Sequence, residues 1–152
     1  QVMADLDACA AWAADKGGDA TRLGITGFCW GGRITWLYAA HNPNCRAGVA
    51  WYGKLTTGHN PAQKAHPIDV AGQLNGPVLG LYGGQDSSIP LEDVRRMQEA
   101  LQKGNEASRA SRIDVYPESG HAFYADYRPS YHAPDARDAW AKAVEWFDRL
   151  LD

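Results

Sequence analysis

Apolar positions along the chain change from helical to extended spacing several times. Four short, mainly apolar runs predict buried strands, and between them apolar residues recur at the three- and four-residue spacing of a helix. The predicted strands are residues 23–28, 46–53, 77–83 and 111–117. The apolar stripes of the predicted helices are Val2, Met3, Leu6, Cys9, Ala10 and Ala13; Ile34, Leu37 and Tyr38; Leu91, Val94, Met97 and Leu101; and Trp140, Ala143, Val144, Phe147, Leu150 and Leu151.

Glycine and proline mark where these elements end. Gly17 and Gly18 stop the first helix, "HNP" at 41–43 stops the second, and Pro90 opens the third. Strands that alternate with helices predict a parallel sheet with helices on both faces, because a right-handed crossover returns each strand in the same direction. The fold class is therefore α/β, with residues 1–152 in a single domain and active residues expected at the carboxyl ends of the strands.

Composition narrows the expected partners. Hydrophobic residues make up 45% of the 152 positions, enough for a packed core, and 15 basic against 18 acidic residues give a net charge of only -3. Nucleic acid is therefore not an expected partner. No apolar run approaches the ~18 residues of a membrane helix, and the first residues do not resemble a signal peptide. The chain begins at Gln1 rather than at a methionine, which predicts a processed or truncated piece of a longer protein.

Cysteine and histidine usage argues against a metal site and a disulfide framework. Three cysteines cannot all pair within one monomer and share no metal-ligand spacing, so free thiols in a reducing, cytoplasmic compartment are expected. Cys9, on the apolar face of the first helix, and Cys45, beside a turn, are interpreted as structural. The histidines interpreted as turn or surface residues, with no zinc spacing among them, are His41, His59, His66 and His132.

The segment "GFCWGG", residues 27–32, places a cysteine between a predicted strand and a predicted helix. This is the context of a nucleophile elbow, in which flanking glycines let the strand and the helix pass close to a strained residue. At a helix N-terminus, unpaired amides and the helix dipole favour the thiolate of Cys29, and the Trp30 amide could face a developing oxyanion. The competing interpretation is that Cys29 is small apolar filler at a tight turn.

A nucleophile needs a base, and the base needs a group that orients it. Asp86, in "GGQDSSIP", follows the third predicted strand, and His121, in "PESGHAF", follows the fourth. The chain order of nucleophile, acid and histidine is that of the α/β-hydrolase triad. Because apolar filler does not predict an acid and a histidine at these strand ends, a Cys-His-Asp triad is the favoured interpretation.

The elbow "GFCWGG", the segment "HPIDVAGQLNGPVLGLYGGQDSSIP" and above all "HAFYADYRPSYH" resemble the bacterial branch of the dienelactone hydrolase family, also called carboxymethylenebutenolidases. The likeness covers essentially the whole chain but only the C-terminal part of that family. It implies an α/β-hydrolase-like three-layer sandwich with a mainly parallel sheet, from which the family's N-terminal strands are missing here. By position it implies that Cys29 is the nucleophile, His121 the base and Asp86 the carboxylate that orients it. The Trp30 amide then forms one half of the oxyanion hole.

The resemblance also implies functional groups that lie upstream of this chain. These are a glutamate that contacts the cysteine and the loop that donates the second oxyanion amide. The family enzyme that acts on dienelactone holds the substrate carboxylate with arginines, one upstream and one shortly after the histidine. Here residues four and five past His121 are Ala125 and Asp126, so Arg128 is the nearest candidate. Asp126 and Arg128 could instead pair with each other and fix the loop.

Aromatic residues at or near the predicted strand ends, including Trp51 and Tyr124, can line a pocket or belong to the core. Tyr52 and Phe123, together with Arg128, are the candidate substrate-binding residues. The sequence thus predicts a cysteine-dependent hydrolase of small esters or lactones with no metal, nucleotide or redox cofactor.

Alternatives from other classes stay open. The chain could be a catalytically incompetent half-domain, or a binding or assembly module, that associates with a missing N-terminal segment or with a second copy of itself. Its predicted first strand would then leave one edge unpaired. A redox-sensing thiol would need a resolving partner for Cys29, and neither Cys9 nor Cys45 is obviously placed for that role.

Overall fold

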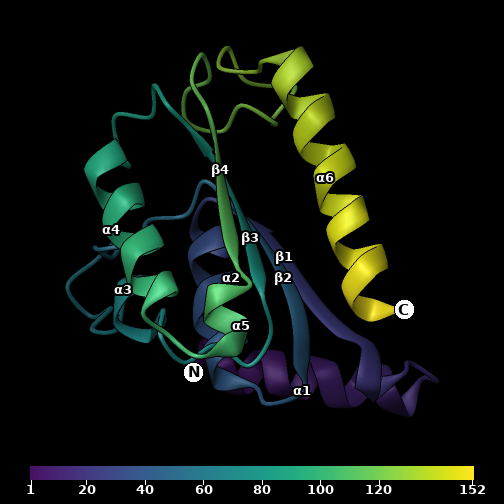
Figure 1. Ribbon diagram of the computed structural model, residues 1–152. Helices are drawn as coiled ribbons and strands as arrows, with labels where there is room; N and C mark the ends of the chain where they lie inside the picture. Colours follow the sequence, from purple (N-terminus) through teal and green to yellow (C-terminus); the bar gives the residue numbers. More distant parts are fainter.

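Parallel strands form the centre of the molecule. The computed structural model describes residues 1–152, and its strands are β1 (Leu23–Phe28), β2 (Cys45–Trp51), β3 (Val78–Gly83) and β4 (Arg112–Tyr116). They lie in chain order across one sheet and all run in the same direction, so their carboxyl ends meet at one edge (Figure 1). The predicted parallel α/β sheet is confirmed, and each predicted strand matches an observed one to within two residues at either end.

The apolar stripes correctly predict the longer helices and miss the short ones. The longer helices are α1 (Val2–Asp15), α2 (Trp30–His41), α4 (Leu91–Gln102) and α6 (Ala133–Leu151). The short ones are η1 (Ala20–Arg22), α3 (Pro67–Val70) and α5 (Glu106–Arg109). A single turn is too short to show a stripe, and the side chains of Asp19 and Asn105 cap two of these turns. None of the helices is both long and apolar enough to span a bilayer.

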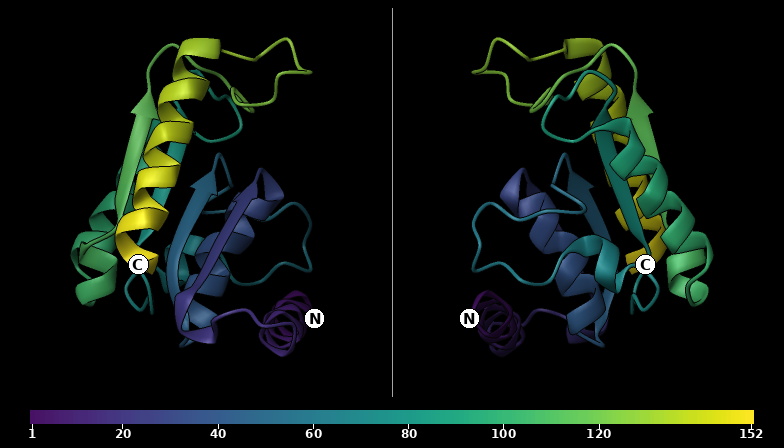
Figure 2. Two further views of the ribbon diagram at one scale, coloured as in Figure 1. Left: turned by 90° about the vertical axis from the view of Figure 1, so that its right-hand side faces the viewer. Right: turned by 90° about the vertical axis from the view of Figure 1, so that its left-hand side faces the viewer.

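Helices cover both faces of the sheet, as predicted. α6 packs on one face, and α2 and α4 pack on the other (Figure 2). β2 and β3 occupy the middle of the sheet, and every residue of β3 is buried. A strand in that position contacts apolar groups on both sides, which explains why β3 is apolar along its length. The result is the three-layer sandwich that the sequence predicts.

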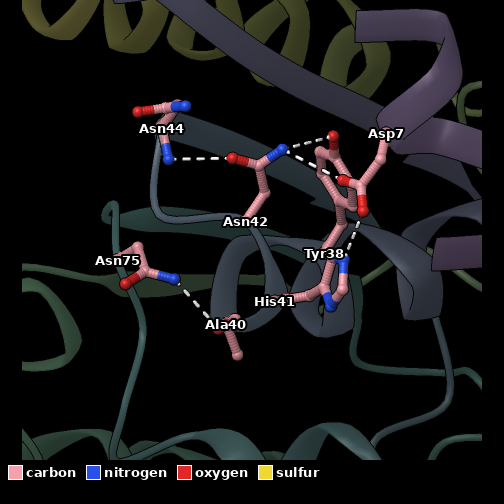
Figure 3. A network of polar contacts seen from close by, with 7 residues as sticks. All are labelled: Asp7, Tyr38, Ala40, His41, Asn42, Asn44 and Asn75. Atoms are coloured by element: carbon pink, nitrogen blue, oxygen red, sulfur yellow. Dashed lines mark hydrogen bonds and ion pairs between the residues drawn. The ribbon is translucent and has the colours of Figure 1, made fainter. Parts of the chain in front are cut away.

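α1 lies at the amino ends of the strands, far from their carboxyl ends (Figure 1). None of its residues is buried and Cys9 is exposed, so the prediction that Cys9 has a structural role is wrong. A polar network joins α1 to the C-terminal end of α2. Asp7 of α1 accepts hydrogen bonds from His41 Nε2 at 2.7 Å and from Asn42 Nδ2 at 3.1 Å (Figure 3). Asn42 Nδ2 also donates to the Tyr38 hydroxyl at 2.8 Å, which ties the network to a buried side chain.

β1 is an edge strand, and its outer side has no partner in this chain. Phe28, its last residue, is 41% exposed, and Trp30 and Trp140 are also exposed. An unpaired strand edge with exposed aromatic side chains is a surface on which another chain segment can add. β1 lies at one side of the sheet, and its unpaired edge runs along the whole strand up to its carboxyl end (Figure 1).

The close passage of β1 past α2 can be tested by adding a methyl group at Gly27. A Cβ atom there would collide with the backbone of Gly31, which cannot move without displacing the helix, whereas a Cβ at Gly31 itself would meet nothing within 4 Å. Gly27→Ala is expected to lower the free energy of unfolding by about 1–3 kcal/mol. Gly31→Ala, the matched control, is expected to be neutral or stabilising. Urea denaturation of both variants checks this, and equal stability of the two would contradict the packing described.

Candidate active site

Cys29 occupies a backbone conformation that few residues other than glycine adopt. Its φ is 53° and its ψ is -116°, in the turn between β1 and α2. The turn is fixed on its inner side, because the Cys29 amide donates a hydrogen bond to the Trp51 carbonyl of β2 at 3.0 Å. A non-glycine residue in such a conformation costs of order 1–3 kcal/mol and persists only where the surrounding structure enforces it. Here the enforcement projects the thiol toward the carboxyl edge of the sheet.

The acid and the histidine come from two loops that are tied to each other. Asp86 follows β3, and His121 follows β4. The Gln85 amide donates to the Ser119 carbonyl at 2.8 Å, and Gln85 Nε2 donates to the Pro117 carbonyl at 3.0 Å. These two hydrogen bonds hold Gln85, the residue before Asp86, against the segment that leads into His121. The loops after β3 and β4 are therefore bonded to each other.

The three predicted triad residues lie in hydrogen-bonding order. His121 Nδ1 is 2.6 Å from Asp86 Oδ2, and His121 Nε2 is 3.3 Å from Cys29 Sγ. Asp86 Oδ1 accepts from the amide and hydroxyl of Ser88 at 2.9 and 2.7 Å. A carboxylate only accepts hydrogen bonds, so Nδ1 must hold the imidazole proton. With this proton on Nδ1, Nε2 is the ring atom that faces the thiol, as a general base requires.

The carboxyl group of Asp86 is ionised in this setting. Its side chain is 1% exposed, and burial alone would raise its pKa, but the hydrogen bonds from His121 and Ser88 outweigh burial and lower the pKa below its ordinary value. A buried carboxylate that keeps its charge at neutral pH can hold the imidazole in one tautomer and stabilise the imidazolium when it forms.

The thiol of Cys29 behaves differently from the sequence-based expectation. Burial raises its pKa; the Arg128 guanidinium acts to lower it, and the Asp86 carboxylate acts to raise it. Burial is the largest of these effects, so the thiol is favoured over the thiolate that the helix N-terminus led us to expect.

The first amides of α2 lie directly beside the thiol. Trp30 is the first residue of this helix and Cys29 precedes it. The first four N–H groups of a helix have no partner within the helix, so the Trp30 amide is available to an oxygen atom on a carbon bonded to Sγ. The position of Trp30 is the one expected for half of an oxyanion hole.

A cavity of about 510 Å³ opens next to Cys29 and is mostly apolar. Tyr52 lines it as predicted, and so does Arg128. Tyr124, which the sequence left as either a pocket residue or a core residue, lines the cavity, and the lining residues that the sequence interpretation missed include Tyr131, Arg137 and Trp140. Arg137 and Trp140 come from the first turns of α6, and only their three-residue spacing on a helix just after the histidine loop could have indicated a shared face.

The structure differs from the sequence interpretation in the place of Phe123 and in the pairing of Asp126 with Arg128. Phe123 is fully buried and does not line the cavity; its ring packs against Tyr52 at 5.5 Å and Tyr116 at 5.1 Å between ring centres, beneath the cavity wall. Asp126 and Arg128 form no ion pair, so the prediction that they pair with each other is wrong. Both line the cavity instead, and the Arg128 guanidinium lies 5.9 Å from the centre of an exposed tyrosine ring.

The remaining cysteine and histidine predictions have mixed outcomes. Cys45 is buried at the start of β2, in keeping with a structural role. His41 pairs with Asp7, and His132 lies 3.0 Å from Asp135 at the start of α6. No group of three or more His, Cys, Asp or Glu side chains is arranged to hold a metal ion.

A parallel sheet covered on both faces, with a cysteine, an aspartate and a histidine brought together from strand ends in that chain order, defines a protein of the α/β-hydrolase class. A family model described as "Dienelactone hydrolase family" matches residues 1–151, and the chain belongs to this family.

Individual relatives agree with this assignment. A protein of Escherichia coli K12 named "Putative carboxymethylenebutenolidase" is 60% identical over 97% of this chain and 53% of its own length. A Bradyrhizobium protein named "Probable 2-oxo-3-(5-oxofuran-2-ylidene)propanoate lactonase" is 31% identical over 92% of this chain and 56% of its own length. A crystal structure from Klebsiella pneumoniae, described as a putative dienelactone hydrolase, superposes with a TM-score of 0.91 at 57% identity, over 97% of this chain and 60% of that one. The chain thus spans little more than half the length of these relatives.

The ionised state of Asp86 predicts a pH-dependent contribution to stability. Its pKa is lower in the folded chain than the unfolded value of about 3.9, so the stabilisation is fully present above that value and is lost as pH falls through the folded pKa. Asp86→Asn has no such titration. The difference in free energy of unfolding between the native chain and Asp86→Asn should shrink as pH falls below about 4, as measured by urea denaturation. A difference that stays constant over this range would contradict the ionised carboxylate.

Proposed function

We propose that the chain has the activity of a cysteine-dependent hydrolase of small esters or lactones. The observation that supports this most directly is the continuous chain of contacts from Asp86 Oδ2 through His121 to Cys29 Sγ, at 2.6 and 3.3 Å. The same residues follow the carboxyl ends of β1, β3 and β4, beside a cavity of about 510 Å³, which is of the size that takes a small molecule.

The proposed reaction begins with proton transfer. Cys29 Sγ attacks the substrate carbonyl carbon while its proton passes to His121 Nε2, and Asp86 stabilises the imidazolium. The Trp30 amide donates to the developing oxyanion. The imidazolium then protonates the leaving oxygen as the C–O bond breaks, which leaves a thioester on Cys29. His121 next takes a proton from water, the hydroxide adds to the thioester carbonyl, and the acid leaves as Sγ recovers its proton.

The neutral resting thiol restricts which substrates suit this site. A thiolate is a better leaving group than an alkoxide, so the tetrahedral adduct returns to substrate unless the alcohol leaves easily. Enol lactones and aryl esters have such leaving groups, and amides do not. The relative from Bradyrhizobium is named as a lactonase, in line with this class of substrate. Arg128 and Tyr52 are proposed to contact the substrate, the guanidinium by binding a carboxylate and the phenol ring by forming the apolar wall.

The open edge of β1 favours a second candidate function, that of an assembly module. An unpaired strand flanked by exposed aromatic rings can recruit another polypeptide segment, either from a longer form of this protein or from a second copy. A chain that elutes as a dimer and turns over no ester would support this candidate. A monomer that turns over an aryl ester would rule it out.

Replacing the proposed nucleophile tests the main proposal. Cys29→Ala should abolish catalytic hydrolysis of p-nitrophenyl acetate, because Cys29 is the thiol in contact with His121 and the acyl intermediate forms on it. Cys9→Ala, which removes an exposed cysteine on α1, is the matched control and should leave the rate unchanged. Release of nitrophenolate is followed by absorbance. Equal rates for the native chain and Cys29→Ala would refute the proposal.

Replacing Arg128 tests the proposed contact with a substrate carboxylate. For an aryl ester with a carboxylate on its acyl group, Arg128→Ala should raise KM about 3- to 10-fold, the range of a solvent-accessible charged hydrogen bond. KM for a neutral ester of the same length should change little. Arg96→Ala, which removes an exposed arginine of α4, is the matched control for the loss of one positive charge. An equal rise in KM for both esters would show that Arg128 does not recognise the carboxylate.

A further inference from the structure

The carboxyl end of each of the four strands is followed by a residue whose side chain lies at the proposed active site. Cys29 follows β1, Asp86 follows β3 and His121 follows β4. Tyr52 directly follows β2, between the strands that deliver the thiol and the carboxylate. The proposed mechanism gives the first three a chemical task and leaves Tyr52 as one residue of the cavity wall.

The backbone at Tyr52 is forced into an unusual conformation. Its backbone φ is 36°, a value that residues other than glycine rarely adopt. The Tyr52 amide donates to the Leu81 carbonyl of β3 at 2.9 Å, and the next residue, Gly53, touches the backbone of α2 so closely that a Cβ there would collide with Arg33. Both sides of the turn are therefore fixed. Strain of this kind is found mainly where a side chain must point in one direction for a functional reason.

The direction that the strained turn imposes is toward His121. The Tyr52 residue is 2% exposed, and its ring centre lies 5.4 Å from that of the imidazole at an interplanar angle of 64°, an edge-to-face contact. Phe123 packs against the same phenol ring at 5.5 Å and 69°. The phenol ring is thus held by Phe123 on one side and meets the imidazole on another, so it cannot turn away.

His121 needs such a contact because its other restraints are few. Its side chain is 35% exposed, and its only hydrogen bond apart from the one to the thiol joins Nδ1 to Asp86. A single hydrogen bond at Nδ1 leaves the ring free to swing about that atom, which moves Nε2 away from Sγ. The following residue, Ala122, also has a positive φ of 60°, so the backbone alone does not favour the observed position.

We propose that Tyr52 is a positioning residue whose ring keeps the imidazole of His121 within reach of the Cys29 thiol. Burial raises the pKa of the Tyr52 phenol, so the group is uncharged at neutral pH and does not compete with the carboxylate for the imidazole proton. The role belongs to the aromatic ring rather than to the hydroxyl. Phenylalanine should fulfil it and an aliphatic residue should not.

This inference rests on the proposed function. Its test therefore measures the reactivity of the Cys29 thiol, which depends on the contact with His121 but not on ester turnover. All variants carry Cys9→Ala, which removes the exposed thiol of α1, so that iodoacetamide reports on Cys29. At pH 7 the alkylation rate of Cys29 is expected to depend on transfer of the thiol proton to His121. His121→Ala defines the rate without that help. Tyr52→Leu should lower the native rate about 10-fold toward the His121→Ala rate, and Tyr52→Phe should restore most of the loss. With p-nitrophenyl acetate, Tyr52→Leu keeps an apolar side chain in the cavity wall, so kcat should fall by a larger factor than KM rises.

Matched controls separate positioning from general damage to the fold. Tyr116→Leu removes another buried tyrosine of the same aromatic cluster that packs on Phe123, and it should leave the alkylation rate at the native value. Circular dichroism and urea denaturation show whether each variant folds. If Tyr52→Leu does not fold, Tyr52→Gly is used in its place, because glycine relieves the positive φ while it removes the ring. The alkylation rate expected for Tyr52→Gly is the same as for Tyr52→Leu.

The possible failures point to different errors. If the native chain and His121→Ala alkylate at the same rate, the Cys29–His121 contact has no chemical effect, and both the function and the inference fall. If His121→Ala is slower but Tyr52→Leu matches the native chain, only the inference falls. If Tyr52→Leu raises KM with kcat intact, Tyr52 binds substrate and does not position His121. A Tyr52→Phe variant as slow as Tyr52→Leu would assign the effect to the hydroxyl and also overturn the inference.

Discussion

The whole site depends on one close packing contact, the passage of β1 against the first turn of α2. Because Gly27 has no side chain, the strand approaches the helix at Gly31, and the single residue that reverses the chain direction, Cys29, takes a strained conformation. The same turn is bonded to β2 through the Trp51 carbonyl. The position of the thiol is therefore set by the sheet and not by a flexible loop.

The elements that could be predicted from sequence are those whose position depends on the strand order alone. Cys29, Asp86 and His121 follow three parallel strands of one sheet, β1, β3 and β4, so chain order and strand ends were enough to bring them together. Tyr52 could be placed in the cavity for the same reason. Phe123 was misplaced because successive side chains in the loop after β4 point in different directions, and only the conformation of that loop decides which of them reaches the cavity.

Other features were out of reach because they depend on a balance of energies. The apolar stripe of α1 predicts burial, but in this chain Met3 and Leu6 are only partly buried against the core, and the Asp7 network also ties the helix to α2. A helix N-terminus favours a thiolate, yet the extent to which Cys29 is removed from water reverses the effect on its pKa, and that extent cannot be derived from the sequence. Arg137 lines the cavity only because α6 begins seven residues before its apolar stripe.

The two ends of the chain lie at the same end of the molecule. Arg22, just before β1, donates hydrogen bonds to the Leu151 carbonyl and, at 2.9 Å, to Asp152 Oδ1, so the C-terminus lies at the amino ends of the strands, as α1 does (Figure 1). The cavity opens at the opposite end of the sheet, beside Cys29. A linker, affinity tag or solid support attached at either terminus would therefore leave the cavity mouth facing outward, which makes the chain suitable for oriented immobilisation on a sensor surface.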